Sequence, residues 1–162
     1  HFAYQLLDPV VLPDVVIAAK PMACGIPLGV AIANEKAAAA LRPGMHGSTY
    51  GGGPLACRVA LEFFDILDEL LPSINTVGDY FRARLNDLAR RFQFVKEVRG
   101  RGLMIGVELD ISGKQLVLDG IKAGLLFNCT HETVLRFLPA YIFTERDVDK
   151  AIKGLTKLFK AV

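Results

Sequence analysis

Two short apolar runs constrain the first half of the chain most strongly. Residues 15–19 and 28–33 are each long enough for a buried β-strand and too short for a helix. Continuous apolar runs of this kind are typical of strands in a parallel sheet that is covered by helices. Two such strands cannot complete a sheet, because their edges and faces stay unpaired. The sequence therefore predicts an incomplete sheet in this part of the chain.

A lysine directly follows the first of these runs. Lys20 stands at the carboxyl end of the predicted strand, and a loop rich in glycine and proline follows at 21–27. An ammonium group at the end of a buried strand loses hydration. It therefore needs an ion-pair or hydrogen-bond partner, access to solvent, or a role as a neutral amine. Taken alone, this feature favours the structural alternative, a lysine whose amine reaches solvent.

Apolar residues at helical spacing predict most of the remaining elements. One helix begins at Pro54 and is expected to end at Pro72, and a second lies between Val77 and Phe92. Thr144 is a good N-cap for the last helix, with Asp147 three residues further on. The other expected elements are a short helix from 34 to 41, an alternating strand at 103–109, a helix at 116–123 capped by Gly124, and strands at 125–128 and 134–138.

We expect these elements to form two unequal parts that meet near Pro72. The first part holds the two apolar strands, and the second is a helix, strand, helix, strand, strand, helix module of α+β type.

The chain has 162 residues, of which 52% are hydrophobic and 22% charged, as in a soluble globular protein. No apolar run reaches the length of a membrane span, and residues 1–9 do not resemble a targeting segment, so a cytoplasmic location is expected.

Charge and cysteine patterns indicate neither nucleic-acid binding nor a metal site. The net charge is +2, and a mild basic bias between Arg82 and Arg101 fits a solvated helix face. The three cysteines, Cys24, Cys57 and Cys129, are odd in number and scattered, without a CxxC pair or a histidine at ligand spacing. We therefore expect no disulfide framework and no zinc.

Two glycine clusters raise the question of nucleotide or phosphate binding. Residues 100–106, GRGLMIG, lead into an alternating strand, whereas a dinucleotide fingerprint opens a helix. Residues 46–53, HGSTYGGG, precede a helix and offer the hydroxyls of Ser48 and Thr49, although the loop lacks the GK[ST] of a P-loop. By itself this loop is equally consistent with a phosphate site and an ordinary turn.

Taken together and in order, these motifs resemble a known family. The lysine in its Gly/Pro loop is followed by HGSTYGGGP, then VRGRGLMIGVEL, then VLRFLPAYIFTERDVDKAI. This succession resembles the class III aminotransferases, which use pyridoxal 5'-phosphate, and the resemblance runs from Phe2 to Lys160. Within the family, residues 124–136, GLLFNCTHETVLR, are most similar to the acetylornithine and ornithine-type enzymes.

The resemblance implies an α/β fold of the fold-type I pyridoxal-phosphate-dependent transferases, present in part. Residues 1–71 would be the C-terminal part of the large cofactor-binding domain, and residues 72–162 the small α+β domain. The implied reaction transfers an amino group from N-acetylornithine, or a similar ω-amine, to 2-oxoglutarate. The alternatives are another class III enzyme, such as an ornithine-type or other ω-transaminase or an aminomutase, and, for the isolated chain, a non-catalytic interaction module.

The resemblance also assigns roles to three residues near the cofactor. A lysine matching Lys20 forms the Schiff base with the cofactor and moves the proton at the substrate carbon; an amine whose ammonium form is disfavoured suits that role. A threonine matching Thr49 binds the cofactor phosphate, usually from the neighbouring subunit of a homodimer, and Ser48 is the lesser candidate. The active site would then be shared between two copies of the chain.

Arg136 matches the arginine that binds the substrate α-carboxylate. A planar guanidinium suits bidentate recognition of a carboxylate. The alternative is a structural salt bridge to Glu132 or Glu145. Arg99 and Arg101, in the VRGRG turn, are expected to be structural.

The sequence departs from the family pattern in several places. Pro21 stands where glycine usually follows the lysine, and Gly53 where asparagine is common. The chain begins at a point that corresponds to the middle of the large domain, so the aspartate that pairs with the pyridine nitrogen, the aromatic that stacks on the ring and the first phosphate loop have no counterparts. Asp8 and Asp14 resemble turn residues instead. We therefore expect the isolated chain to be inactive.

Overall fold

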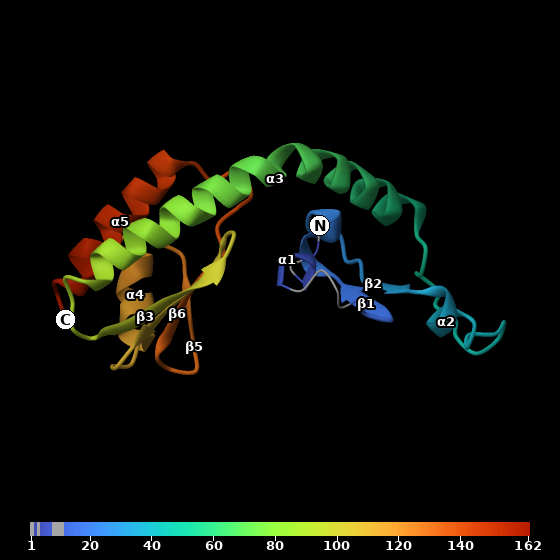
Figure 1. The fold of residues 1–162 in the computed structure, drawn as a ribbon, viewed down its shortest axis with the longest axis horizontal. Helices are drawn as coiled ribbons and strands as arrows, with labels where there is room; N and C mark the ends of the chain where they lie inside the picture. Colours follow the sequence, from blue (N-terminus) through green and yellow to red (C-terminus); the bar gives the residue numbers. More distant parts are fainter. Residues whose placement is uncertain (1, 3, 8–11) are drawn as a thin grey trace. The chain divides into compact units, whose positions relative to one another are not determined.

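The computed structural model describes residues 2, 4–7 and 12–162, and Asp8 lies outside this range. Helices and strands are interspersed along the chain, which gives a mixed α/β fold (Figure 1). The chain forms two compact units, His1–Asp68 and Glu69–Val162. None of the helices in the described part of the chain combines the length and the apolar composition that a membrane span requires.

The first unit is built around a two-stranded antiparallel sheet. Strand β1 (Val15–Ala18) pairs with β2 (Val30–Ala33), from Val15 opposite Ala33 to Ala18 opposite Val30. The prediction of a parallel arrangement is therefore wrong. Parallel neighbours need a crossover connection of about a dozen residues or more, usually with an α-helix. The connection at 19–29 contains only a four-residue 3₁₀-helix at Lys20–Ala23.

The strands of this sheet are also less buried than their composition predicts. The Ile17 side chain is 81% exposed and that of Val15 47%. No third strand pairs with β1 or β2 among the residues that the structure describes. The sheet is thus incomplete within this chain, as the two short apolar runs indicate.

Short helical segments complete the first unit before its long helix. They are α1 (Tyr4–Leu7), the 3₁₀-helix η1 (Lys20–Ala23) and α2 (Glu35–Ala38). Asn34 caps α2, because its Oδ1 accepts a hydrogen bond from the Ala37 amide at 2.9 Å. The helix ends at Ala38 rather than Leu41, and it buries no side chain that could stabilise a longer segment.

Helix α3 runs without interruption from Pro54 to Ala89 and belongs to both units. The prediction that Pro72 ends a helix is wrong. Proline removes one backbone donor, but the apolar stripe stays in phase across it, and packing of that stripe outweighs the local cost. Buried residues recur every seventh position, at Leu67, Ile74, Phe81 and Leu88.

The second unit contains a four-stranded antiparallel sheet in the order β3-β4-β6-β5. Its strands are β3 (Val95–Arg101), β4 (Met104–Leu109), β5 (Asn128–Thr130) and β6 (Val134–Phe137). The sequence pattern predicts β4 and β6 well. It does not predict β3, because a register irregularity between Val95 and Glu97 interrupts the alternation that would have marked the strand.

One face of this sheet forms the core of the second unit. Its strand residues pack with buried side chains of α3 and of α5 (Glu145–Phe159), and the rings of Phe81 and Phe137 meet edge to face at 5.7 Å. Helix α4 (Lys114–Lys122) lies against α5. The buried strand residues are Ile105, Val107, Leu109, Leu135 and Phe137. The alternate strand residues, Arg136 among them, lie on the opposite face, which is exposed or half-buried.

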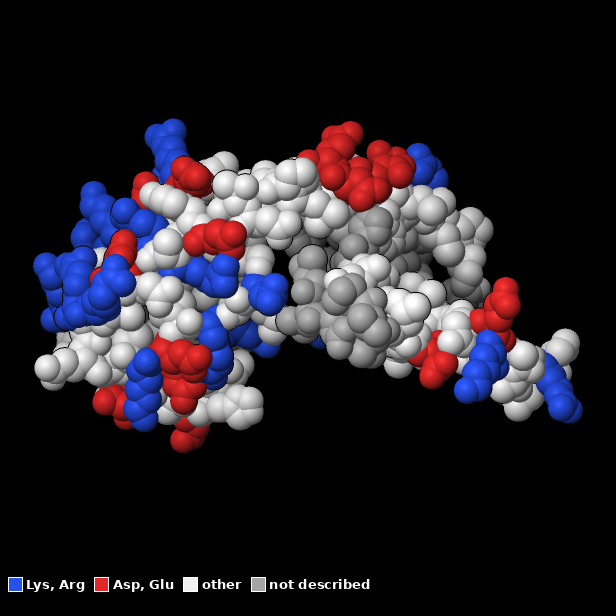
Figure 2. Space-filling model, viewed as in Figure 1, with Lys and Arg blue, Asp and Glu red and all other residues white. Residues whose placement is uncertain are grey.

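The basic residues of the second unit are interspersed with acidic ones (Figure 2). Arg82 pairs with Asp79, Arg90 pairs with Asp87, and Arg84 lies 3.2 Å from Asp149. The basic bias seen in the sequence is thus largely compensated by neighbouring carboxylates.

Helix α5 begins with the capping box that Thr144 and Asp147 predict. The Thr144 Oγ1 accepts a hydrogen bond from the Asp147 amide, and the Asp147 Oδ2 accepts one from the Thr144 amide, both at 3.3 Å. Hydrogen bonds from the Thr144 hydroxyl, from Lys150 and from the Thr144 amide lower the pKa of Asp147 from 3.8 to about 2.

This depressed pKa predicts how stability depends on pH. A carboxyl whose folded pKa is lower than its unfolded pKa stabilises the folded protein above the unfolded value of 3.8, and that contribution disappears as the pH falls through about 2. We expect Asp147→Asn to lower the urea midpoint at pH 6, with the difference from wild type shrinking steadily below pH 4. Asp110→Asn, at an exposed carboxylate with no side-chain hydrogen bond among the described residues, is the control. A difference that does not depend on pH would contradict the assignment.

Candidate active site

Lys20 is the first residue of η1, and only Ala19 separates it from the end of β1. It has a left-handed backbone with φ of 60°, which is uncommon for a residue other than glycine. Such conformations concentrate at functional sites, so this one supports a functional role for Lys20. The lysine borders an open hollow lined by Ala19, Gly25, Ile26, Pro27, Leu28 and Gly29.

Lys20 is more exposed than the sequence predicts, and the structure explains why proline can follow it. Lys20 is exposed, so this chain alone does not provide the dry environment that would favour a neutral amine. Pro21 lies in the first turn of η1, where no backbone donor is needed and a fixed φ is helpful. Its carbonyl accepts a hydrogen bond from the Cys24 amide at 3.0 Å. Proline is therefore compatible with the turn that presents Lys20.

Ser48 and Thr49 lie in the exposed loop that leads into α3. The Ser48 Oγ accepts a hydrogen bond from the Gly51 amide at 3.0 Å, which tightens the turn. The Thr49 hydroxyl has no partner among the described residues, so it is the freer of the two to bind a ligand. The loop ends at Pro54, the start of a long helix, where free amides and the helix dipole favour an anion. These residues fit a phosphate group.

Arg136 lies on β6, on the sheet face opposite the core. Its Nε donates a hydrogen bond to Asn128 Oδ1 at 3.1 Å. In the described part of the chain no carboxylate lies within ion-pair distance of its guanidinium, and Glu132 pairs with Lys114 at 2.6 Å instead. The structural alternative for Arg136, a salt bridge to Glu132 or Glu145, is thus not formed. Its Nη1 and Nη2 groups are left for a ligand.

Arg99, on the same face of the sheet, is engaged by other residues. It pairs with Glu97 at 2.8 Å and with Glu108 on the neighbouring strand. The hydrogen bond that Arg99 donates to Glu108 is the main cause that raises the pKa of the Arg99 guanidinium. The structural role expected for Arg99 agrees with these pairings.

The candidate residues fall in both units of the chain. Lys20, Ser48 and Thr49 lie in the first unit, and Arg136 lies in the second. Neither hydroxyl residue lines the hollow beside Lys20. The sequence pattern overlooked Asn128, although the register that places it opposite Arg136 could have been tested on the two strands predicted there. No group of three or more His, Cys, Asp or Glu residues suited to a metal occurs in the range that the structure describes.

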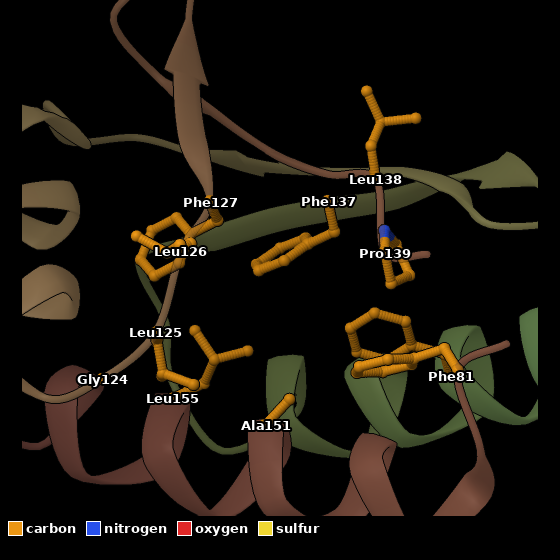
Figure 3. A pocket seen from close by; sticks show the side chains of 11 residues that line it. Phe81, Gly124, Leu125, Leu126, Phe127, Phe137, Leu138, Pro139, Ala151 and Leu155 are labelled. Atoms are coloured by element: carbon orange, nitrogen blue, oxygen red, sulfur yellow. The ribbon is translucent and has the colours of Figure 1, made fainter. Parts of the chain in front are cut away.

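The second unit also contains an apolar cavity of about 230 Å³. Figure 3 shows the side chains that surround it, which come from α3, α5 and the segments around β5 and β6. Phe81, Phe127, Phe137 and Leu155 are among them, together with Pro139. None of its lining side chains is charged, so the cavity offers no acid, base or nucleophile.

A strand-end lysine, a loop that could hold a phosphate and an arginine without an acidic partner are the features that the resemblance to a pyridoxal-phosphate-dependent transferase implies. The comparison with known families agrees. Residues 1–159 match the model of the class III aminotransferases, and the chain belongs to this family. Members of the family depend on pyridoxal phosphate.

Curated relatives define where the similarity lies within the family. The chain is 42% identical over 157 residues to acetylornithine aminotransferase of Aquifex aeolicus, a match that covers 97% of this chain and 40% of the relative. It is 41% identical over 152 residues to the enzyme of the same name from Methanocaldococcus jannaschii, covering 93% of this chain and 38% of the relative. The chain thus spans about 40% of the length of these relatives.

Solved structures of similar fold come from the same group. The chain aligns with acetylornithine aminotransferase of Elizabethkingia anophelis at a TM-score of 0.87 and 29% identity, over 94% of this chain and 40% of that one. Ornithine aminotransferase of Toxoplasma gondii aligns at a TM-score of 0.86 and 33% identity, over 94% and 38%. An amine transaminase from an uncultivated Pseudomonas species, with a TM-score of 0.83 and 27% identity over 92% and 38%, is described in its PLP-bound form.

Proposed function

We propose that this chain is the C-terminal part of a pyridoxal-phosphate-dependent aminotransferase that moves an amino group from N-acetylornithine, or a similar ω-amine, to 2-oxoglutarate. The observation that carries the proposal is the family match over residues 1–159, a range that contains every candidate residue of the site. The 42% identity to an acetylornithine aminotransferase supports the choice of donor.

Lys20 has the chemistry that the cofactor requires. Pyridoxal phosphate, when bound, supplies a carbonyl carbon that reacts with amines and a ring that accepts electrons. Lys20 would hold the cofactor through its Nζ. The same Nζ, when not engaged with the cofactor, would accept and return the proton at the substrate carbon that carries the amino group. The backbone of η1 fixes the position of the Lys20 Cα, from which the side chain extends.

The loop before α3 binds the phosphate in this proposal. The Thr49 hydroxyl donates to a phosphate oxygen, while the Ser48 hydroxyl maintains the turn by accepting from Gly51. We propose that Thr49 serves the site of a second subunit, so that the intact enzyme is a two-fold homodimer with shared active sites. Sedimentation of the intact enzyme at assay concentration tests this arrangement, and an active monomer would contradict it.

Arg136 binds the substrate α-carboxylate. Its strand holds the guanidinium on a rigid element, and its Nη1 and Nη2 groups are free to donate two parallel hydrogen bonds to one carboxylate. A hydrogen bond to a charged group contributes about 1.5–3 kcal/mol, so loss of this pair weakens binding and orientation of the substrate.

Arg136→Lys is expected to lower kcat/KM for 2-oxoglutarate roughly ten- to a hundredfold, because lysine keeps the charge and loses the planar fork. The donor half-reaction suffers equally if the donor also binds by its α-carboxylate. It is unaffected if the ω-amine donor binds in the opposite direction. Single-turnover rates of each half-reaction separate these cases. Normal rates in both, with normal folding and cofactor loading, would contradict the role of Arg136.

The choice of substrate is tested by comparing donors with the intact enzyme. We expect kcat/KM to be higher for N-acetylornithine than for ornithine. A reversed preference would favour an ornithine aminotransferase, the second candidate, which the similarity to the Toxoplasma gondii structure supports. Repeated turnover of the donor to an isomeric amine in the absence of 2-oxoglutarate would indicate an aminomutase.

We also propose that these 162 residues alone do not catalyse transamination, since they span about 40% of the length of the relatives. The alternative role for the isolated chain is a non-catalytic interaction module. The isolated chain mixed with pyridoxal phosphate is expected to show no visible absorption band of a bound cofactor, and the intact enzyme is expected to show one.

A further inference from the structure

Asn128, Arg136 and Gly106 form one row across the sheet of the second unit. Arg136 on β6 is opposite Asn128 on β5 and also opposite Gly106 on β4. Residues paired in this way project from the same face of a sheet. The neighbours of Arg136 on its own strand, Leu135 and Phe137, are buried on the other face. The row therefore lies on the face that is not packed into the core.

The contact between Asn128 and Arg136 has a defined direction. Arg136 Nε lies 3.1 Å from Asn128 Oδ1, within the ordinary range for a hydrogen bond. A guanidinium only donates, so the side-chain carbonyl of Asn128, and not its amide nitrogen, must face it. Asn128 thus accepts from one edge of the guanidinium and leaves the other donors unoccupied.

The surroundings of the row leave Arg136 without a competing acid. On the far side, Gly106 has no side chain, and a Cβ there would lie 3.3 Å from Val134 Cγ1. Glu108, two residues along β4 on the same face, is held by Arg99. Arg136 therefore has the neutral amide of Asn128 on one side and Gly106 on the other, with Arg99 next in the same row.

We infer that Asn128 is a positioning residue for Arg136, an inference that rests on the proposed role of this arginine. A guanidinium can bind a carboxylate side-on, through Nε and one Nη, or end-on, through both Nη groups. Because Asn128 occupies Nε, the side-on mode is closed and the end-on mode remains. The amide fixes the direction from which the substrate carboxylate approaches, and its neutrality keeps the charge of Arg136 available.

The first test shortens the side chain at 128 in the intact enzyme. Asn128→Ala is expected to raise KM for 2-oxoglutarate roughly tenfold, equivalent to about 1.4 kcal/mol, with kcat changed less than about twofold. The rate with propanal, an amino acceptor without a carboxylate, should not change. Thr130→Val alters a half-buried residue of the same strand and face that does not touch Arg136, and it is the matched control. Equal losses with both acceptors would overturn the inference.

A second variant separates positioning from a structural role. Asn128→Asp keeps the size of the side chain and still accepts a hydrogen bond from Arg136, so a purely structural contact would survive. Its negative charge, however, competes with the substrate carboxylate for the guanidinium. We expect Asn128→Asp to raise KM for 2-oxoglutarate more than Asn128→Ala does, without lowering Tm. A KM at the wild-type value in Asn128→Asp would overturn the inference.

A double variant distinguishes failure of this inference from failure of the proposed function. Lysine at position 136 has no Nε donor, so Asn128→Ala should raise KM by less than about twofold in an Arg136→Lys background. A full tenfold effect in that background would show that Asn128 acts independently and would overturn the inference alone. If Arg136→Lys itself leaves KM for 2-oxoglutarate unchanged, the carboxylate role of Arg136 fails, and positioning by Asn128 fails with it.

Discussion

Replacing Lys20 with alanine is expected to reduce transamination by the intact enzyme by about a thousandfold or more. A positioned acid or base contributes about 10²–10⁴-fold to a rate, and Lys20 is also the proposed covalent attachment point. The rate should be measured in each half-reaction under single-turnover conditions, where binding and chemistry are separable. Both half-reactions should fail, because the same amine moves the proton in each direction.

Two further variants show whether the loss comes from the amine. Lys20→Arg keeps a positive charge but not a nucleophilic amine, so it should be as inactive as Lys20→Ala. Lys36→Ala removes an exposed lysine of the same unit and should retain full activity. Activity within about tenfold of wild type in Lys20→Ala would exclude Lys20 as the catalytic amine.

A large loss of stability is expected from Gly78→Val. A Cβ at Gly78, within helix α3, would lie 2.4 Å from the carbonyl oxygen of Gly102 in the turn between β3 and β4. Overpacking typically costs about 1–3 kcal/mol, and here the obstacle is backbone that cannot rotate away. Valine adds two methyl groups to the clash, so we expect a loss of about 4 kcal/mol.

Thermal unfolding measures this loss directly. For a protein of 150–250 residues each kcal/mol shifts Tm by roughly 2–4 °C, so Gly78→Val should lower Tm by roughly 8–16 °C. Asn75→Val introduces the same side chain at an exposed position of the same helix and should shift Tm by less than about 2 °C. Equal shifts in both variants would contradict the close approach of the turn to the helix.

The sequence predicts well those features whose signals are local. Thr144 and Asp147 predict a capping box, and the structure confirms it because both partners lie within one turn. The alternation of buried and more exposed residues along β4 likewise follows from the sequence of that strand alone. Features that depend on distant contacts are predicted less well. Pro72 has the local signature of a helix end, yet the in-phase stripe of Leu67 and Ile74 continues the helix across it.

In the candidate site, too, local signals are visible in the sequence and distant contacts are not. Lys20 is recognisable because an apolar run and a glycine-rich turn flank it, but its left-handed backbone and its exposure follow from η1 and from the incomplete sheet around it. The direction of pairing between β1 and β2 depends on their connection rather than on their composition. Asn128 reaches Arg136 through the register of two strands, and composition alone does not reveal such a register.

The central claim is that Lys20 is the residue to which the cofactor attaches. Borohydride reduction of the intact enzyme loaded with pyridoxal phosphate, followed by proteolysis and mass spectrometry, tests it most directly. We predict a single phosphopyridoxyl group, carried by the peptide that contains Lys20. A label on Lys36, or on any other lysine in place of Lys20, would contradict the assignment.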